Sequence, residues 1–324
     1  MAKHLPTRQH NRIQVDTSQD GLDRRGFLEC MAWVGTGVLW TVSGGILSSR
    51  RLAFAADEKP PVGEFHFVQI SDSHIGFAAD ANRDVTATLQ VAIDRINAVQ
   101  PAPAFLLHTG DLTHGQKPAE FDTLAEHLKS ANAKQVFYVP GEHDVFADGG
   151  KEFLARHGRG LSGKGWGSFD YKGVHFVGLN NVAELKAGGM GALGDDQLEW
   201  LERDVAGLSS STPLVVFAHI PLWAVYPEWG WGTEDGARAL SYLRRFGSVT
   251  VLNGHIHQVM RKVEGNITFH TAMSTAFPQP APGSAPKPGP MKVPADQLRG
   301  LLGVTSVTAA LNPGPLALVD STLA

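Results

Sequence analysis

The sequence predicts a mixed α/β fold built on a sheet that helices cover on both sides. From about Glu64 onward, short apolar runs of strand-like composition alternate with segments whose apolar residues recur at helical spacing. Such alternation is typical of strands separated by helices. The chain has 324 residues, of which 43% are hydrophobic, so it is long and apolar enough to bury a large core.

The first half of this pattern consists of three strands separated by two helices. The apolar run at residues 65–71 predicts a strand. Residues 84–99 predict a helix, because four apolar side chains fall on one of its faces: Val85, Leu89, Ile93 and Ile96. Residues 104–110 and 135–141 predict two further strands, and the amphipathic pattern of residues 118–130 predicts a helix between them.

The second half begins with a hairpin and continues the alternation. Residues 167–181 predict two strands joined by a tight turn near Lys172 and Gly173. Residues 195–208 predict a helix with Asp195 as its N-cap. A strand, a helix and two strands follow, at residues 213–219, 235–246, 249–255 and 265–273.

The C-terminal part differs in composition. Residues 277–294 are rich in proline, glycine and alanine and predict an extended loop. This loop is either a plain linker or a segment that folds back over the functional site. A closing strand is expected within residues 314–323, so residues 277–324 are assigned to the same domain as residues 56–276.

Residues 1–55 are interpreted as a signal peptide and not as part of the fold. Arg24 and Arg25 are followed by a short, glycine-containing apolar segment and a small-x-small site that ends at Ala55. This order resembles a twin-arginine (Tat) export signal cleaved after Ala55, and it implies transport by the Tat translocase to a periplasmic or other extracytoplasmic location. The apolar segment is short for a permanent membrane span, although an uncleaved N-terminal anchor remains the alternative.

Charge and cysteine content exclude several classes of protein. The formal net charge of −4 provides no basic field for bulk binding to nucleic acid. Cys30 is the single cysteine of the chain, so neither an intrachain disulfide nor a cysteine-based zinc site is expected. Because Cys30 precedes the expected cleavage site, the exported chain would contain no cysteine, which suits an oxidising compartment.

Residues that can bind metal ions follow five of the predicted strands, just past the C-terminal end of each. They are Asp72 and His74; Asp111; Glu142, His143 and Asp144; His219; and His255 and His257. This edge is where open α/β sheets bind ligands. A single histidine after a buried strand is more often structural, but five such clusters in order indicate a metal site. Mixed aspartate and histidine ligands suit zinc, manganese or iron, whereas magnesium and calcium prefer oxygen ligands.

The order of these clusters resembles that of the calcineurin-like metallophosphoesterase family. The matching motifs are Asp72-Ser-His74, Gly110-Asp111, Gly141-Glu-His-Asp144, His219 and Gly254-His-Ile-His257, within about residues 65–269. The resemblance implies a four-layer αββα sandwich in residues 56–276 and two bound metal ions. The first ion would be held by Asp72, His74 and His257, and the second by Glu142, His219 and His255. Asp111 would bridge both ions.

The same resemblance implies the reaction. A hydroxide that bridges the two metal ions would attack the phosphorus atom in line with the leaving group. His143 would stabilise the phosphoryl oxygens or protonate the leaving oxygen, and Asp144 would orient His143. This chemistry is physically sound, since two cations about 4 Å apart can hold both the nucleophile and the phosphate oxygens.

Glu142 departs from the family pattern, in which this position is usually asparagine. With asparagine, two aspartates and a bridging hydroxide give a pair of divalent ions a net charge of about +1, and ligation by Glu142 lowers it to about zero. Three alternatives follow. A trivalent ion such as Fe³⁺ restores the charge, or the site prefers phosphodiester monoanions to phosphomonoester dianions, or Glu142 turns away and the second ion binds weakly. The first two are favoured over the third.

Two loops are candidates for binding the substrate. Four aromatic side chains follow His219 and could stack on a flat group, although a self-packed loop is slightly favoured: Trp223, Tyr226, Trp229 and Trp231. The proline-rich loop offers only Lys287 and Lys292 as charges that could meet a phosphate. His114, close to Asp111, is expected to be a surface or supporting residue.

The sequence therefore predicts an exported, binuclear metal-dependent phosphoesterase that carries two ions of iron, manganese or zinc. Its substrate would be a small phosphoester, and more specifically a phosphodiester. The alternative is a catalytically weak or inactive metal-binding or partner-binding protein of the same fold. Glu142 is the one feature that supports this alternative, whereas the complete set of ligands speaks against it.

Overall fold

The computed structural model describes residues 38–43, 46–51, 64–309 and 316–324 of the protein. Two antiparallel strands, β1 (Val38–Ser43) and β2 (Ile46–Arg51), pair within an N-terminal unit that is distinct from the main one. The paired arginines and the cleavage site of the expected export signal lie outside the described residues. Among the helices that the structure describes, none has the length and hydropathy needed to cross a membrane.

The main unit contains two sheets, so the expectation of a single central sheet was wrong. The five-stranded sheet has the order β13-β12-β3-β4-β5. Its strands are β3 (Phe65–Ile70), β4 (Leu106–His108), β5 (Val136–Tyr138), β12 (Gly303–Ala309) and β13 (Ala317–Thr322). Strands β3, β4 and β5 are parallel, while β12 pairs antiparallel with β3 and with the closing strand β13.

The six-stranded sheet has the order β10-β11-β9-β8-β7-β6. Its strands are β6 (Gly167–Tyr171), β7 (Val174–Gly178), β8 (Leu214–Phe217), β9 (Val249–Asn253), β10 (Arg261–Glu264) and β11 (Ile267–Thr271). The four central strands are parallel, and β10 and β6 pair antiparallel at the edges. Lys172 and Gly173 turn between β6 and β7 with φ of 47° and 83°, which confirms the predicted hairpin.

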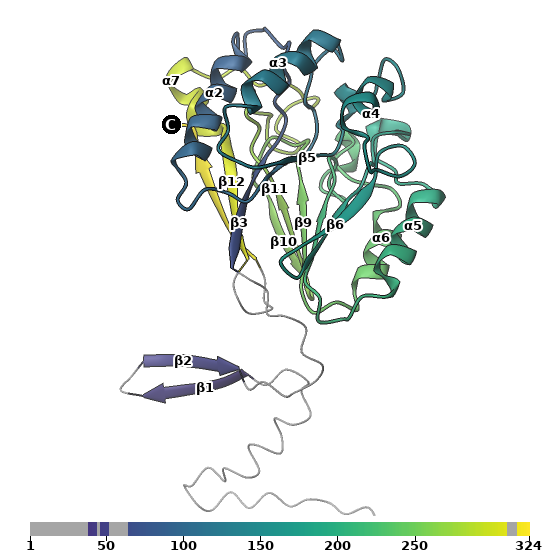
Figure 1. Cartoon of the computed structure of the whole chain (residues 1–324). Coiled ribbons are helices and arrows are strands. Elements are labelled where there is room, and N and C mark those ends of the chain that lie inside the picture. The colour runs from purple at the N-terminus through teal and green to yellow at the C-terminus, as the bar shows by residue number, and fades with distance from the viewer. Residues whose placement is uncertain (1–37, 44–45, 52–63, 310–315) are drawn as a thin grey trace, which may run out of the picture. The chain divides into compact units, whose positions relative to one another are not determined.

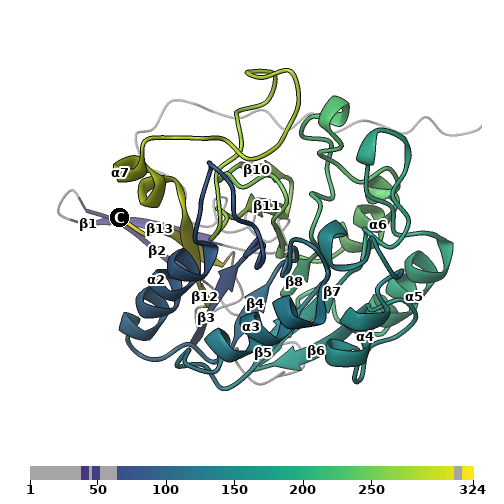
Figure 2. The same ribbon diagram turned by 90° about the horizontal axis from the view of Figure 1, so that it is seen from above.

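Helices cover the outer face of each sheet, which confirms the four-layer αββα sandwich (Figure 1, Figure 2). Helices α2 (Val85–Ala98) and α3 (Pro118–Leu128) pack on the five-stranded sheet. Helices α5 (Asp195–Ala206) and α6 (Gly236–Leu243) pack on the six-stranded sheet. Two short helices, α4 (Lys151–His157) and α7 (Ala295–Leu298), complete the described set of α-helices.

Helix α5 begins at Asp195, but Asp195 is not its N-cap. Gly194 holds the capping position, with φ of 78° and ψ of 163°. The carboxylate of Asp235, which precedes α6, accepts hydrogen bonds from the N–H groups of Leu193 and Gly194 at 3.0 and 2.9 Å. The loop before α5 is therefore held by the residue that precedes α6, a contact that local sequence does not reveal.

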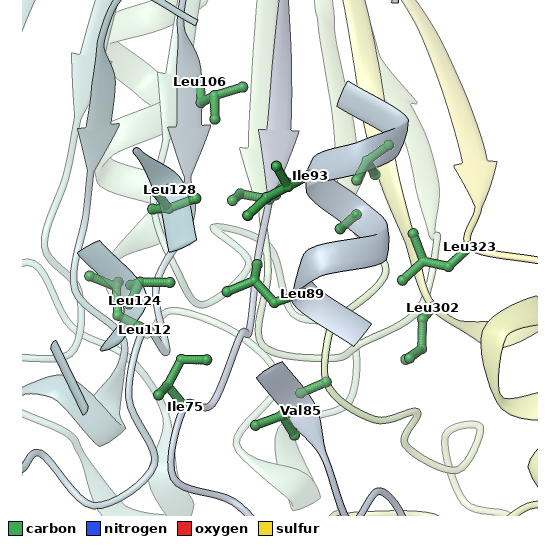
Figure 3. Close-up of a cluster of buried hydrophobic side chains, with 14 of the residues drawn as sticks. Ile75, Val85, Leu89, Ile93, Leu106, Leu112, Leu124, Leu128, Leu302 and Leu323 are labelled. Atoms are coloured by element: carbon green, nitrogen blue, oxygen red, sulfur yellow. The ribbon is translucent and has the colours of Figure 1, made fainter. Parts of the chain in front are cut away.

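Apolar clusters hold the layers together. Under α2 and α3, the predicted helix face is buried, and Figure 3 shows Leu89 and Ile93 of α2 close to residues from α3 and the sheet. Between the sheets the packing is aromatic, with Phe105 lying 5.0 Å from Phe67 and 5.3 Å from Phe176 by ring centroids. This aromatic core packs the inner faces of the two sheets against each other.

Asp320 joins the closing strand to the other sheet. Its carboxylate accepts hydrogen bonds from Arg261 and His270 of the six-stranded sheet at 2.6 and 2.9 Å, and from Thr305 of β12 at 2.7 Å. Burial opposes the charged form of Asp320, but these donors outweigh it and lower its pKa to about 2. The end of the chain is therefore an integral part of the sandwich.

Candidate metal centre

The predicted metal ligands meet where parallel strands of both sheets end. Asp72 and His74 follow β3, Asp111 follows β4, Glu142 follows β5, His219 follows β8, and His255 and His257 follow β9. The ligand atoms form groups of three in which all atoms lie within 4.8 Å of one another. The sequence correctly predicted that these residues come together. It did not reveal that they reach the site from two sheets.

The first group contains Asp72, His74 and His257, each at most 2% exposed. His257 Nε2 lies 3.2 Å from Asp72 Oδ1 and 3.3 Å from His74 Nε2. His257 Nδ1 donates to the carbonyl of Phe277 at 2.5 Å, so Nε2 presents its lone pair to the group. Burial and the neighbouring histidines hold the pKa of His74 well below its usual value, which favours the neutral imidazole that binds metals.

The second group contains Glu142, His219 and His255. Glu142 Oε2 lies 3.0 Å from His219 Nε2, and Glu142 Oε1 lies 3.1 Å from His255 Nδ1. Glu142 Oε2, His219 Nε2 and His255 Nδ1 are buried, yet none makes a hydrogen bond within the described part of the chain. Buried polar atoms normally have a hydrogen-bond partner. Three such atoms that lie close together without a hydrogen bond could bind a zinc, manganese or iron ion.

In the second group, the two histidines act on the pKa of Glu142. Burial disfavours the charged form of Glu142, but His255 and His219 outweigh it and hold the pKa of Glu142 well below its usual range. His219 Nδ1 donates to the carbonyl of Thr109 at 2.7 Å, which directs its other nitrogen at the group. Both carboxylate oxygens of Glu142 therefore face the histidines of this group.

Asp111 lies between the two groups. Its Oδ2 atom is 3.4 Å from His74 Nε2 in the first group and 3.5 Å from His219 Nε2 in the second. Its Oδ1 atom accepts a hydrogen bond from the N–H group of His143 at 3.0 Å. A carboxylate oxygen within reach of one histidine from each group has the position that a shared ligand requires.

The turns that carry the ligands have an unusual backbone conformation. Five of the seven predicted ligands have positive φ: Asp72 at 53°, His74 at 40°, Asp111 at 51°, His255 at 70° and His257 at 54°. Non-glycine residues adopt this region rarely and mostly at functional sites. Glycine makes the close approach possible, since a Cβ on Gly254 would lie 2.6 Å from Asp72 Oδ2.

His143 lies at the rim of the second group. Its Nδ1 atom donates to the carbonyl of His114 at 2.8 Å, which leaves Nε2 free for a ligand. Burial disfavours the charged form of His143, but the carboxylates of Asp111 and Glu142 and the His114 carbonyl outweigh it and raise the pKa. A histidine that is readily protonated can stabilise phosphoryl oxygens or give a proton to a leaving oxygen.

The prediction that Asp144 orients His143 was wrong. Its carboxylate instead accepts hydrogen bonds at 2.9–3.0 Å from the N–H groups of Leu112, Thr113 and Gly141 and from the Thr113 hydroxyl. Residues 142–144 form a 3₁₀ turn, in which successive side chains point about 120° apart, so Asp144 faces the interior and His143 the cavity. Burial raises the pKa of Asp144 to about 7, against the pull of the three N–H groups. Through these hydrogen bonds, Asp144 connects the loop after β4 with the loop after β5.

A cavity of about 260 Å³ opens over the metal ligands. Trp229 and Trp231 form part of its wall, and residues 288–290 of the proline-rich loop form another part. Of the two alternatives for this loop, the one that folds back over the site is therefore confirmed. The loop that carries Trp229 and Trp231 also packs on itself. Trp231 is 1% exposed, and the centroids of the two rings lie 5.0 Å apart, edge to face.

His114 is closer to the site than the sequence suggested. Its Nδ1 atom lies 3.3 Å from His74 Nδ1, and its ring stacks on that of His143 at 4.7 Å. The available signal was its place three residues after Asp111, in the turn that carries a ligand. Neither lysine of the proline-rich loop lines the described cavity, and Lys292 forms an ion pair with Asp80 at 3.1 Å.

Known proteins share this sequence pattern and fold. Residues 65–259 match the family model of the calcineurin-like phosphoesterases. A probable cyclic nucleotide phosphodiesterase of Rhodopseudomonas palustris is 28% identical over 244 residues, which cover 68% of this chain and 83% of that protein. A serine/threonine-protein phosphatase of Danio rerio is 26% identical over 231 residues, which cover 62% and 73%. The crystal structure of a dimetal phosphatase from Danio rerio has a TM-score of 0.58 and 15% identity, and covers 81% of this chain and 99% of that one.

Proposed function

The chain belongs to the calcineurin-like phosphoesterase family and is a metal-dependent phosphoric ester hydrolase, and we propose that it cleaves a phosphodiester at a pair of metal ions. The names of the two sequence relatives support phosphodiester and phosphomonoester chemistry alike. The observation that carries the choice is Glu142, whose carboxylate lies among the ligands of the second group.

The described residues divide naturally between two ions. Asp72, His74 and His257 would hold the first ion. Glu142, His219 and His255 would hold the second, since their donor atoms are buried without hydrogen bonds. Asp111 would be shared. Nitrogen and oxygen donors in this ratio suit iron, manganese or zinc.

When bound, such a metal pair supplies an activated water and neutralises the charge of the phosphate group. The residues of the chain would position the ester around it. His143 Nε2 would contact a phosphoryl oxygen or deliver a proton to the departing oxygen, because its other nitrogen is held by the His114 carbonyl. The indole rings of Trp229 and Trp231 and the proline-rich loop would shield this contact from bulk water.

Glu142 favours a diester on grounds of charge. A third carboxylate lowers the charge of the site by one unit, so a substrate that carries two negative charges loses more attraction than one that carries one. The lining of the cavity, as far as the structure describes it, includes no lysine or arginine that would replace this charge. A trivalent iron ion in the pair would restore the unit of charge that Glu142 removes.

The place of action would be outside the cytoplasm. Arg24, Arg25 and the small-x-small site at Ala55 support export through the Tat translocase. Replacing both arginines by lysine should retain the protein in the cytoplasm as an uncut precursor, measured by cell fractionation and mass spectrometry. A variant that is still exported and cut at the same bond would refute this localisation.

Elemental analysis and a matched pair of substrates test the proposal together. Protein recovered from its native compartment should contain two metal ions per chain. After loading with manganese or iron, it should hydrolyse bis(4-nitrophenyl) phosphate with a higher kcat/KM than 4-nitrophenyl phosphate. A chain that binds one ion or none, and that hydrolyses neither ester after loading, would favour the alternative of an inactive binding protein.

A further inference from the structure

We propose that a second hollow beside His143, walled by Phe146, binds one of the two organic substituents of the phosphodiester. This inference rests on the proposed function and extends it from the reaction to the substituents of the substrate. The hollow is termed the Phe146 pocket. It is lined by residues 114–116 of the loop after β4 and by residues 142, 143, 146 and 147 of the loop after β5, and its volume is about 350 Å³.

The Phe146 pocket is adjacent to the cavity over the metal ligands. His114, Glu142 and His143 line both. Because His143 is proposed to contact the phosphoryl group and lines both spaces, a group attached to that phosphate could enter either one. The pocket is therefore positioned as a subsite of the same substrate, not as an independent surface feature.

Phe146 is unusually exposed for an aromatic side chain. It is 81% exposed, more than any other large hydrophobic residue in the described part of the chain, where Val263 follows with 70%. A phenylalanine ring exposed to water gains from contact with an apolar or aromatic group. Phe146 lies beside His143 and could contact a substrate there. Val263, on edge strand β10, does not line this pocket.

Hydrogen bonds hold the segment that directly follows Phe146. Gln116 Oε1 accepts a hydrogen bond from the N–H group of Ala147 at 2.5 Å, and Gln116 Nε2 donates to Asp148. Asp148 in turn accepts hydrogen bonds from the N–H groups at the start of α4, including that of Glu152 at 2.8 Å. The exposed ring therefore lies on a turn that hydrogen bonds hold in place.

Gln116 also has a strained backbone, with φ of 55°. Among the seven described non-glycine residues with positive φ, five are predicted ligands and Lys172 lies in a hairpin turn. Gln116 is the remaining one. Strain of this kind persists where the surroundings maintain it, and here it places the amide of Gln116 against the turn of Phe146.

The presence of two spaces around one reactive histidine matches a phosphate with two substituents. One substituent would lie against Trp229, Trp231 and the proline-rich loop, and the other against Phe146. Neither lining contains a lysine or arginine in the part of the chain that the structure describes. Neither substituent is therefore expected to carry a negative charge, and the one at Phe146 is expected to be apolar or aromatic.

Binding of two symmetrical diesters tests this inference by affinity and not by hydrolysis rate, with each ester checked for cleavage after the titration. Diphenyl phosphate and dimethyl phosphate carry the same charge and differ only in their substituents. Isothermal titration calorimetry with metal-loaded wild-type protein should give at least tenfold tighter binding of diphenyl phosphate. The Phe146→Ala variant should lose about tenfold of this preference, and Phe146→Leu, which keeps an apolar side chain, should lose less than threefold. Val263→Ala is the matched control and should retain the wild-type preference.

Three results would overturn the inference. Wild-type protein could bind both diesters equally, or Phe146→Ala could retain the full preference. Alternatively, sedimentation could show that wild-type protein is a dimer and Phe146→Ala a monomer, which would assign the surface to a second copy of the chain. The calorimetric ratios and the sedimentation result decide the inference, whereas the absence of hydrolysis with every ester would count against the proposed function.

Discussion

Replacing Glu142 by asparagine or glutamine removes one negative charge from the second group of ligands. Asparagine restores the residue usual in the family, and glutamine keeps the length of the side chain. Both variants retain an oxygen donor, so His219 and His255 would still have a third partner. The change therefore isolates the charge of Glu142 from the number of ligands.

The distances in the site set the size of the expected effect. The donor atoms of this group lie within 4.8 Å of one another, so a phosphate bound among them would lie about 5 Å from the Glu142 carboxylate. One additional charge on the phosphate interacts with that carboxylate by about 3 kcal/mol at an effective dielectric constant of about 20. Because the Glu142 side chain is 21% exposed, about 1.4–2.8 kcal/mol is expected, which is about 10- to 100-fold.

The measured quantity is the ratio of kcat/KM for bis(4-nitrophenyl) phosphate to that for 4-nitrophenyl phosphate, at a pH where the monoester is a dianion. Both variants should lower this ratio by about 10- to 100-fold. Glu184→Gln makes the same change of charge at a side chain that is 64% exposed and should leave the ratio unaltered. If both Glu142 variants keep two metal ions and the wild-type ratio within twofold, the charge argument is refuted.

Three further predictions concern catalysis and stability. His143→Ala should lower kcat by about 100-fold with unchanged metal content, since His143 is not among the proposed ligands; steady-state kinetics and elemental analysis measure both, and unchanged turnover would remove His143 from the reaction. Leu89→Ala should lower the free energy of unfolding by about 3 kcal/mol in urea denaturation, because Leu89 is 0% exposed in the core of Figure 3, and a loss below about 1 kcal/mol would contradict this packing. Asp320→Asn should lower it by about 1–2 kcal/mol at pH 7, because the pKa of Asp320 falls from 3.8 when unfolded to about 2 when folded. That contribution is complete above pH of about 4 and is lost as the pH falls through about 2, so a difference that stays constant into acid would disprove it.

The sequence was sufficient to predict which residues gather at the candidate site, because metal chemistry restricts both their type and their place. Asp72, His219 and His255 each follow an apolar strand, and such strands end at a common edge. The division of these strands between two sheets was not predictable in this way. A strand buried on both faces, such as β8, has the same apolar composition whether its outer cover is a helix layer or a second sheet.

Contacts between side chains distant in sequence were the least predictable feature. Adjacency of His143 and Asp144 suggested a pair, but a 3₁₀ turn directs the two side chains apart. The actual partner of His143 is a backbone carbonyl, that of His114, and carbonyl groups leave no mark in the residue types. The closure of the proline-rich loop over the site likewise depends on tertiary contacts such as that between Gln279 and the His255 carbonyl at 2.8 Å.

The turns that carry the ligands are held in place by hydrogen bonds within the chain. The N–H group of His255 donates to the Asp72 carboxylate at 3.1 Å, and the N–H group of His74 donates to the carbonyl of Asp111 at 2.9 Å. The hydroxyl of Ser274 donates to the carbonyl of Asp72 at 2.8 Å. These bonds join loops from both sheets and maintain backbone conformations that are each unfavourable by about 1–3 kcal/mol. Because these bonds maintain the strained turns, they hold the candidate ligands close together in the folded sandwich.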